Sequence, residues 1–373
     1  MSDEYPLMAF IANVGVAPKG DRYNRSSLVS DIENKLYKKT KLGDFIYSSN
    51  NLESNSIGLN KYGKASISPV YSIFQPTEIT DSDFLGRRLV RKDFINSMVK
   101  WRQGVIYGQW RIHESDFIKI EVLVPLLEEQ KKIGSFLDDL DRFIALHQRK
   151  LDALKQMKKG FLQQLFPESG EKLPRVRFTG FEGEWEQRRL GDYAEILTGG
   201  TPKTSISEYW EPKKIPWISS GEVNKRRLDG TDNMISEEGL NNSSARWVKA
   251  HSVLIALAGQ GKTRGTVAVN NIRLTTNQSI AAIVLKDNLH YEFVYQNLFK
   301  RYDELRMFSS GDGTRGGLNK QIVSDVVIPS PNKEEQFKIG AFFKHLDNTI
   351  TLYQYKLDQL NILKKSCLQN MFI

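Results

Sequence analysis

The stretch EEQKKIG at Glu128–Gly134 returns as EEQFKIG at Glu334–Gly340, and position 334 lies 206 residues after position 128. The agreement continues through the residues that follow each copy, always at this one offset. A run of matches at a fixed offset indicates that the chain contains an internal duplication. The further matches pair Leu140-Asp141 with Leu346-Asp347, Lys150-Leu151-Asp152 with Lys356-Leu357-Asp358, Lys158-Lys159 with Lys364-Lys365, and Leu162-Gln163 with Leu368-Gln369.

Apolar residues within both copies recur at alternating steps of four and three, which is the spacing of a heptad seam. A seam this narrow needs a partner helix to cover it. The sequence therefore predicts two helices of about 35 residues, each about 50 Å long at about 1.5 Å per residue, that pack as a coiled coil. The predicted interface residues are Ile133, Leu137, Leu140, Ile144, Leu151 and Leu154 in the first helix, and Ile339, Phe343, Leu346, Ile350, Leu357 and Leu360 in the second.

Helix ends and chain connectivity then define the architecture. Pro167 stops the first helix, Pro331 can occupy the first helical position of the second, and Asn332 with Glu335 can form a capping box. Residues 168–328 start where the first helix ends and return the chain to the second helix, so a compact fold of this segment makes the helices antiparallel. The predicted order is a first domain at 1–124, a first long helix at 125–167, a second domain at 168–328 and a second long helix at 329–373.

The two predicted domains share an order of elements. Leu42–Tyr47 and His251–Ile255 each read as a strand that follows a polar turn, and helical stretches follow at 83–99 and 291–307. The predicted fold class is α+β, with two mixed domains joined by two long antiparallel coiled-coil helices in a pseudo-two-fold repeat. A lead-in at Leu173–Gly200 precedes the second domain and has no counterpart in the first. Either the first domain is short on its N-terminal side, or the sequence is a rearranged or clipped version of a longer arrangement.

Composition narrows the class of protein. The 53 Lys and Arg residues against 44 Asp and Glu leave a formal net charge of +9, which favours a polyanionic partner. The single cysteine, Cys367, cannot form an internal disulfide, and no Cys and His residues stand at metal-ligand spacing. The start at Met1 does not resemble a signal peptide, and no run of about 18 apolar residues occurs. We therefore expect a cytoplasmic protein without a metal site.

A combination of local motifs carries a resemblance to a known family. The motifs are Val124–Ile133 with its second copy, Gly183-Glu184-Trp185 with Leu190-Gly191-Asp192, and the Gly-rich loop Gly311–Gly317 before Leu318-Asn319-Lys320. Over nearly the whole chain this combination resembles the specificity subunit of type I restriction-modification systems. The resemblance implies two target-recognition domains, each of which reads one half of a bipartite, asymmetric sequence in double-stranded DNA. It also implies that the helical pair sets the spacer between the two halves.

The resemblance implies further partners. Two modification subunits would dock on the helices and methylate adenine with S-adenosylmethionine, and restriction subunits would translocate and cleave DNA with ATP and Mg. The chain itself would hold no cofactor and would not be an enzyme, in keeping with the lack of an Asn-Pro-Pro-Tyr methyltransferase motif. The residues leave open an alternative, a coiled-coil scaffold with two protein-binding modules. That alternative predicts no steep dependence of binding on salt, whereas phosphate contacts predict one.

Two glycine-rich segments partly match nucleotide-binding motifs. Ala256–Thr263 resembles a phosphate-binding loop, but Ala256 stands where the leading glycine belongs and a strand-like run, Arg264–Val269, follows in place of a helix. A hairpin loop that contacts DNA, or a solvated turn, fits this segment better. Gly311–Gly316 has the spacing G-x-G-x-x-G but follows a helical segment, so we expect a DNA groove contact there and not a dinucleotide site.

Several predicted loops carry residues suited to DNA contact, because Asn and Gln can bond adenine bidentately and Arg can bond guanine. In the second domain the candidates are Thr201, Lys203, Thr204, Ser219, Ser220, Lys225, Arg226, Gln260, Lys262, Thr263, Arg264, Asn277, Gln278, Arg315, Asn319 and Lys320. In the first domain they are Lys19, Arg22, Arg25, Asn55, Ser56, Arg102, Gln103, Gln109 and Arg111.

Other polar and aromatic residues receive different predictions. Polar groups in a heptad seam cost stability and select partners, so Lys158 and Lys364 are expected to mark surface that a modification subunit covers. Trp101 and Trp110 are expected to pack in the core, because a duplex offers no unstacked base to an aromatic ring.

Overall fold

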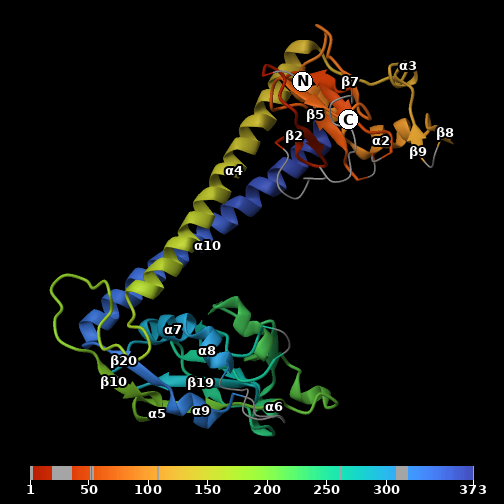
Figure 1. Cartoon of the computed structure of the whole chain (residues 1–373). Coiled ribbons are helices and arrows are strands. Elements are labelled where there is room, and N and C mark those ends of the chain that lie inside the picture. The colour runs from red at the N-terminus through yellow and green to blue at the C-terminus, as the bar shows by residue number, and fades with distance from the viewer. Residues whose placement is uncertain are drawn as a thin grey trace. The chain divides into compact units, whose positions relative to one another are not determined.

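The computed structural model describes residues 3–18, 36–50, 52, 54–106, 109–259, 262–307 and 318–372. The chain divides into two compact units, whose elements are labelled in Figure 1. Unit 1 comprises Met1–Gln148 together with Lys356–Ile373, and unit 2 comprises Arg149–Tyr355. Two long helices, α4 (Leu127–Gln164) and α10 (Lys333–Asn370), contribute one part to each unit.

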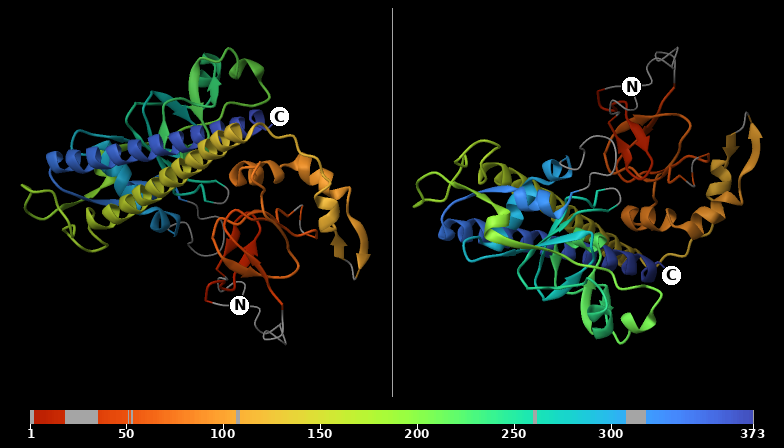
Figure 2. Two further views of the ribbon diagram at one scale, coloured as in Figure 1. Left: turned by 90° about the horizontal axis from the view of Figure 1, so that it is seen from above. Right: turned by 90° about the horizontal axis from the view of Figure 1, so that it is seen from below.

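The two long helices run antiparallel within each unit, as chain connectivity predicts. In unit 1 Asp141 pairs with Lys364, while Ile133, earlier in α4, clusters with Met371, later in α10. Figure 1 and the left view of Figure 2 show the yellow α4 and the blue α10 side by side. All twelve residues predicted for the helix interface are buried or half-buried. The predicted fold class, with its two α+β domains and paired long helices, is confirmed.

Unit 2 is built around a five-stranded sheet whose central strand is covered on both faces. Strand β16 is the apolar run Val253–Ala256, and its side chains alternate between two cores. Val253 and Ile255 pack in the cluster that contains Phe293 and Phe343, whereas Leu254 and Ala256 pack in the cluster that contains Ile218. One face of the sheet therefore lies against helices and the other against a second sheet.

The described strands of unit 2 form three sheets. The five-stranded sheet has the order β11-β19-β16-β17-β13, the four-stranded sheet has the order β14-β12-β18-β15, and β10 pairs with β20. The remaining strands are β10 (Glu186–Arg189), β11 (Ala194–Thr198), β12 (Ile215–Ile218), β13 (Arg227–Leu228), β14 (Asn233–Ile235), β15 (Trp247–Val248), β17 (Val267–Asn270), β18 (Leu274–Thr276), β19 (Ile280–Leu285) and β20 (Val327–Ser330). The helices are α5 (Leu190–Tyr193), η3 (Ser207–Tyr209), η4 (Ser220–Lys225), α6 (Glu237–Asn241), α7 (Tyr291–Lys300), α8 (Tyr302–Met307) and α9 (Lys320–Asp325).

Unit 1 contains a smaller version of the same arrangement. Its central sheet has the order β5-β4-β7, and Phe45, Tyr47 and Phe94 lie in the core beside it. The strands are β1 (Ala9–Ile11), β2 (Gly15–Ala17), β3 (Lys38–Thr40), β4 (Phe45–Tyr47), β5 (Ile57–Leu59), β6 (Ala65–Ile67), β7 (Ser72–Phe74), β8 (Gln103–Ile106) and β9 (Gln109–Arg111). The helices are α1 (Ser82–Leu89), α2 (Lys92–Val99) and α3 (Glu114–Phe117).

The central sheets of the two units correspond strand by strand. In unit 1 β4 pairs with β5 on one side and β7 on the other, and in unit 2 β16 pairs in the same antiparallel way with β17 and β19. In both units a helix follows the third strand of this set, α1 after β7 and α7 after β19. The predicted relationship between the two domains is therefore visible in strand pairing as well as in element order.

The start of α10 agrees only in part with the predicted signals. The Asn332 side chain accepts a hydrogen bond from the Glu335 backbone N–H at 2.9 Å, so Asn332 caps the helix as expected. Glu335 does not complete a capping box, because both of its carboxylate oxygens accept from Arg177 at 2.7 Å. Pro331 lies before the cap and not at the first helical position, so that prediction was wrong.

The duplicated glutamine of the Glu-Glu-Gln motif fastens each domain helix to a long helix. In unit 1 the Gln130 side chain accepts from the backbone N–H of Asp81, the cap of α1, at 3.0 Å. In unit 2 the Gln336 side chain accepts from the backbone N–H of His290, the cap of α7, at 2.9 Å. Both glutamines are almost fully buried, at 1% and 0% exposure. The repeated motif is therefore a structural clamp between each domain and the helical pair.

Aromatic residues at corresponding positions of the repeat also make corresponding contacts beside each clamp. In unit 2 the Phe166 ring lies 5.2 Å from Phe293 and 5.9 Å from Phe343. In unit 1 the Phe372 ring lies 5.0 Å from Phe84, and both cluster with Leu137. Phe372 lies 206 positions after Phe166, the offset of the repeat. A phenylalanine two residues after each long helix therefore packs on a domain helix.

Gly340→Ala is expected to destabilise unit 2 even though alanine favours helix. An added Cβ would lie 2.8 Å from Glu292 Cβ and 2.9 Å from His290 Nδ1, so α7 would have to move. We expect a net loss of about 1–2 kcal/mol in unfolding free energy, because overpacking exceeds the gain in helix propensity. Gly160→Ala in α4 is the matched control, since nothing lies within 4 Å of its added Cβ. Urea unfolding should show the control stabilised by about 1 kcal/mol, and equal effects of the two substitutions would contradict the clamp.

Candidate nucleic-acid interface

Three loops of unit 2 meet where strands β11, β12 and β18 end. The backbone N–H of Gly200 donates to Thr276 O at 2.9 Å, and that of Asn277 donates to Ile218 O at 3.0 Å. A Cβ at Gly199 would lie 1.8 Å from Thr276 O, so only glycine permits this approach. Backbone hydrogen bonds therefore hold the loops after the three strands against one another.

Polar side chains gather on these loops. The Thr201 hydroxyl donates to Gln278 Oε1 at 2.8 Å. The Asn224 amide, from the η4 turn that follows Ser219, donates to Thr263 Oγ1 at 3.2 Å and so ties the β16–β17 hairpin loop to this group. We refer to Thr201, Ser219, Ser220, Thr263 and Gln278 as the loop cluster, and all five are exposed or half-exposed. Amide and hydroxyl groups of this kind can read base edges.

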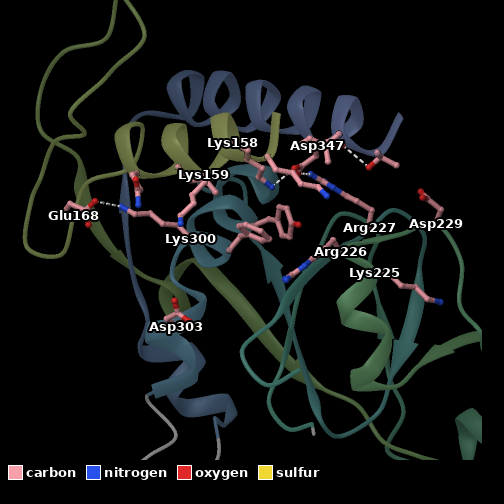
Figure 3. A pocket seen from close by; sticks show the side chains of 17 residues that line it. Lys158, Lys159, Glu168, Lys225, Arg226, Arg227, Asp229, Lys300, Asp303 and Asp347 are labelled. Atoms are coloured by element: carbon pink, nitrogen blue, oxygen red, sulfur yellow. Dashed lines mark hydrogen bonds and ion pairs between the residues drawn. The ribbon is translucent and has the colours of Figure 1, made fainter. Parts of the chain in front are cut away.

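A strongly basic cavity of about 860 Å³ lies at the other end of η4. Figure 3 shows its side chains, most of which come from α4, α7 and α10 and from residues 225–229. The Arg226 guanidinium lies 4.8 Å from the Phe299 ring centre inside it. Among the described residues that line this basic pocket, the cations are Lys155, Lys158, Lys159, Lys225, Arg226, Arg227 and Lys300, and the anions are Glu168, Asp229, Asp303 and Asp347. Cations therefore outnumber anions, which suits the pocket to a phosphate group.

The deepest charges of the basic pocket neutralise one another. Lys158 pairs with Asp347 at 2.5 Å, and Arg227 reaches the same carboxylate at 2.9 Å (Figure 3). Arg227 also pairs with Glu292. Burial lowers the pKa of the Lys158 ammonium, although Asp347 opposes the change. The prediction that a partner subunit covers Lys158 was wrong, because Lys158 is 8% exposed and paired within unit 2.

Unit 1 holds the duplicate of this ion pair with less burial. Lys364 pairs with Asp141 at 2.6 Å, and Arg87 pairs with Asp141 at 2.8 Å. Lys364 thus contacts the other long helix but is still one-third exposed, so its predicted contact with a modification subunit stays a prediction. Burial raises the pKa of Asp141, but hydrogen bonds from Lys364 and Arg87 outweigh it and leave that pKa below its ordinary value of 3.8. The ionised carboxylate therefore stabilises unit 1 above about pH 4, and this stabilisation is lost as the pH falls through the lowered pKa.

The structure separates the residues that the sequence grouped in unit 2. Lys225 and Arg226 lie in the basic pocket and not in the loop cluster, and Lys225 pairs with Glu222 and Asp232. The Asn319 side chain accepts from Ile322 N–H at 2.9 Å and caps α9, so its amide oxygen is engaged within the fold. Asn277 Oδ1 likewise accepts from Ser279 N–H at 3.1 Å. Lys203, Thr204, Lys262, Gln278 and Lys320 are exposed, and Arg264 is half-exposed.

Unit 1 gathers fewer of its predicted contact residues. Ser56 is 5% exposed, so it cannot present its side chain to a duplex and that prediction was wrong. Gln103, Gln109 and Arg111 lie in the β8–β9 hairpin and not in loops, and β9 pairs Arg111 with Gln103. Gln103 is exposed and donates to Asp116 at 3.0 Å, Arg111 and Asn55 are exposed, and Arg102 is half-exposed. Trp101 is 38% exposed, so its predicted place in the core was wrong.

Some predicted contact residues lie outside the part of the chain that the structure describes. They are Lys19, Arg22, Arg25, Gln260 and Arg315, together with the loop Gly311–Gly317. The side chains of Gln109 and Trp110 belong to the same set.

Sequence reasoning missed the lysines that face Arg226 across the basic pocket. Lys155 and Lys159 come from α4, and Lys300 comes from α7, where it also donates to the carbonyl oxygens of Phe166 and Pro167. One signal was available: Lys155, Lys158 and Lys159 share a helix face at spacings of three and four. The sequence could not show that this face meets the turn at Lys225–Arg227.

Within the described ranges, no group of three or more His, Cys, Asp and Glu side chains is arranged to hold a metal ion. None of the described helices is long and apolar enough to span a membrane.

Comparisons with known proteins agree on one family. The family model described as "Type I restriction modification DNA specificity domain" matches residues 17–156 and 182–361. The type I restriction enzyme EcoR124I/EcoR124II specificity subunit of Escherichia coli is 29% identical over 175 residues, which cover 46% of this chain and 43% of that protein. The MjaIX specificity subunit of Methanocaldococcus jannaschii is 31% identical over 198 residues, which cover 51% of this chain and 44% of that protein. Both alignments thus span less than half the length of these relatives.

A solved structure extends the likeness to the whole fold. The crystal structure of a type I restriction-modification S subunit from M. genitalium superposes with a TM-score of 0.62 at 16% identity, covering 100% of this chain and 90% of that chain. At this identity the likeness concerns the fold alone.

Asp347→Asn is expected to lower the unfolding free energy of unit 2 by about 3 kcal/mol, because it leaves Lys158 and Arg227 partly buried beside a neutral partner. Asp141→Asn makes the same change in unit 1, where Lys364 is one-third exposed, and should cost about 1 kcal/mol. Urea unfolding at pH 7 measures both losses. A larger loss for Asp141→Asn, or no loss for either variant, would show that burial does not govern the strength of these pairs.

Proposed function

Because the chain belongs to the type I restriction-modification DNA specificity family, we propose that it is the non-catalytic subunit that reads the DNA target of such a complex. The observation that carries this proposal is the loop cluster of unit 2, joined by the short η4 helix to the basic pocket. Base-edge contacts specify a sequence, whereas phosphate contacts position the protein on the duplex. The loop cluster has the chemistry of the first and the basic pocket that of the second.

We propose that the target is bipartite and asymmetric. The duplicated clamps, Gln130 in unit 1 and Gln336 in unit 2, support two equivalent readers. The polar residues differ between the units, with a β8–β9 hairpin in one and the loop cluster in the other. Two readers with different polar groups recognise different half-sites. The helical pair would set the spacer, since α4 has 38 residues and a length of about 57 Å at about 1.5 Å per residue.

The proposal extends to partners that the chain itself does not contain. Modification subunits would dock on the helical pair and bring S-adenosylmethionine, and restriction subunits would bring ATP and Mg. Their place of action would be the cytoplasm. Exposed apolar side chains on the outer surfaces of the long helices, such as Phe143 and Leu146 on α4 and Leu352 and Ile362 on α10, support docking of this kind.

Methylation mapping tests the proposed function. The chain is co-expressed with its modification subunit in cells that lack other adenine methylation, and methyladenine is located by sequencing. We expect methylation at one motif made of two half-sites that a fixed spacer separates. Methylation at a continuous motif, or methylation that does not depend on this chain, would contradict the proposal.

Two variants separate base reading from phosphate contact in unit 2. Gln278→Ala should relax one half-site at one or two positions and cost about 1–3 kcal/mol of discrimination against a wrong base, while the other half-site stays unchanged. The double substitution Lys155→Gln with Lys159→Gln should weaken binding to all sequences and make the salt dependence less steep. Lys150→Gln, an exposed α4 lysine outside the basic pocket, is the control.

Fluorescence anisotropy of the assembled complex over a range of salt concentrations measures these effects. If affinity does not fall with salt for the unaltered complex, the protein-binding scaffold becomes the better description.

A further inference from the structure

The four-stranded sheet of unit 2 brings the ends of three strands to one edge. In the order β14-β12-β18-β15, β12 and β18 run parallel, and β15 runs antiparallel to β18. The edge at which β12 and β18 end is therefore the edge at which β15 begins. Ser219 follows β12 and Asn277 follows β18 there, and Arg246 precedes β15. An arginine outside the set of predicted contact residues thus lies at the edge that carries the loop cluster.

Strand pairing places Arg246 beside the last residue of β18. Trp247 stands opposite Thr275 in the antiparallel pair, so Arg246, one residue earlier, comes level with Thr276. The Thr276 carbonyl oxygen accepts the hydrogen bond from Gly200 N–H, at 2.9 Å, that joins β18 to the loop after β11. Arg246 is therefore adjacent to a hydrogen bond that holds the loop cluster together.

Close contacts fix the backbone that carries Arg246. A Cβ added to Gly200 would lie 2.7 Å from Ser244 Cβ and 2.9 Å from Ser244 Cα, so Ser244 packs directly on the glycine. The Ala245 backbone N–H donates to Ser243 Oγ at 3.2 Å. A side chain on a restricted backbone can be directed at one base, because less conformational freedom is lost on binding.

The alternation of side chains gives the direction of Arg246. Ala245 and Trp247 both pack in one apolar cluster, whereas Val248 packs with Val223 of η4 in the core on the other face of the sheet. Arg246 stands between Ala245 and Trp247, so it faces the same side as Val248 and η4. The first residue of η4 belongs to the loop cluster, so Arg246 and the cluster share this side of the sheet.

The Arg246 guanidinium is available to a ligand. The side chain is exposed, and it makes no hydrogen bond or ion pair with the described part of the chain. The members of the loop cluster, by contrast, carry neutral hydroxyl and amide groups. The fork of an arginine can bond O6 and N7 of one guanine together, which is the commonest base-specific contact in the major groove. Arg246 thus adds a group suited to guanine to a surface of neutral groups.

We propose that Arg246 is a specificity-determining residue of unit 2, which reads a guanine in the half-site that the loop cluster contacts. This inference rests on the proposed function, since it requires the loop cluster to meet base edges. A contact with phosphate needs only the charge of the side chain, whereas a bidentate contact with guanine needs the planar fork. The two kinds of contact therefore differ in the effect of Arg246→Lys.

The test uses the complex with the modification subunit and a set of duplexes in which each base pair of the mapped target is changed in turn. Arg246→Ala should lower discrimination at one G·C pair by about 10- to 100-fold, because it removes a bidentate contact. That pair should lie in the half-site that Gln278→Ala also relaxes, and the other half-site should stay unchanged. Binding competition against the unaltered target measures discrimination at each position.

Two further variants separate base reading from charge. Arg246→Lys keeps the charge but not the fork, so it should retain overall affinity while most of the discrimination stays lost. Arg273→Ala is the matched control, because Arg273 is also exposed but precedes β18, at the strand end away from the loop cluster, where its guanidinium lies 4.0 Å from the Trp247 ring centre. It should leave the base preference unchanged at every position. Urea unfolding of Arg246→Ala should match that of the unaltered chain, since the side chain is exposed.

Three outcomes would overturn the inference in a complex whose unaltered form methylates a bipartite target. They are an unchanged base preference in Arg246→Ala, an equal loss of affinity for every duplex that Arg246→Lys restores, and relaxation of the half-site that Gln278→Ala leaves unchanged. The second outcome would make Arg246 a phosphate contact. Methylation that does not depend on this chain would instead contradict the proposed function itself.

Discussion

The buried glutamine clamp at the start of each long helix is the constraint on which the remaining structure depends. Gln130 and Gln336 each accept a hydrogen bond from the backbone N–H that begins a domain helix, and both side chains are almost fully buried, so losing that partner would be costly. The glycine four residues later, Gly134 or Gly340, permits the close approach of that helix. Domain helix and long helix are thus fixed together, and the loops that follow inherit their positions.

Ion pairs between the two long helices fix how one helix is positioned along the other. Lys158 pairs with Asp347 and Lys364 with Asp141, and both pairs arise from the same two positions of the duplicated sequence. A slip of one helix along the other would leave these charges unpaired in a largely apolar seam, which is costly. In unit 2 the same carboxylate also binds Arg227, so the register of the helices fixes one wall of the basic pocket.

The two units share three paired strands, but the described sheets of unit 2 contain further strands. Strands β5, β4 and β7 repeat the pairing of β17, β16 and β19, but unit 2 adds β11 and β10 from its lead-in. In unit 2 the lead-in therefore extends the central sheet beside β19 and pairs with β20, and its Arg177 pairs with the buried Glu335.

The sequence by itself determined the duplication, the two long helices, their seam residues and the hairpin character of the loop between β16 and β17. These features depend on periodicity and on local turn chemistry, which involve only residues that are close together in the sequence. The cap at Asn332 belongs with them, since it concerns residues three apart.

Only the tertiary structure decided which polar residues meet. Lys158 and Asp347 stand 189 positions apart, and their contact follows from the antiparallel register and not from any local pattern. The loop cluster likewise joins Thr201 to Gln278, and the basic pocket joins Lys155 to Arg226, because strand order and helix packing bring distant segments together. Long-range pairing is a property of the packed chain as a whole, which is why the helices could be predicted and the composition of the site could not.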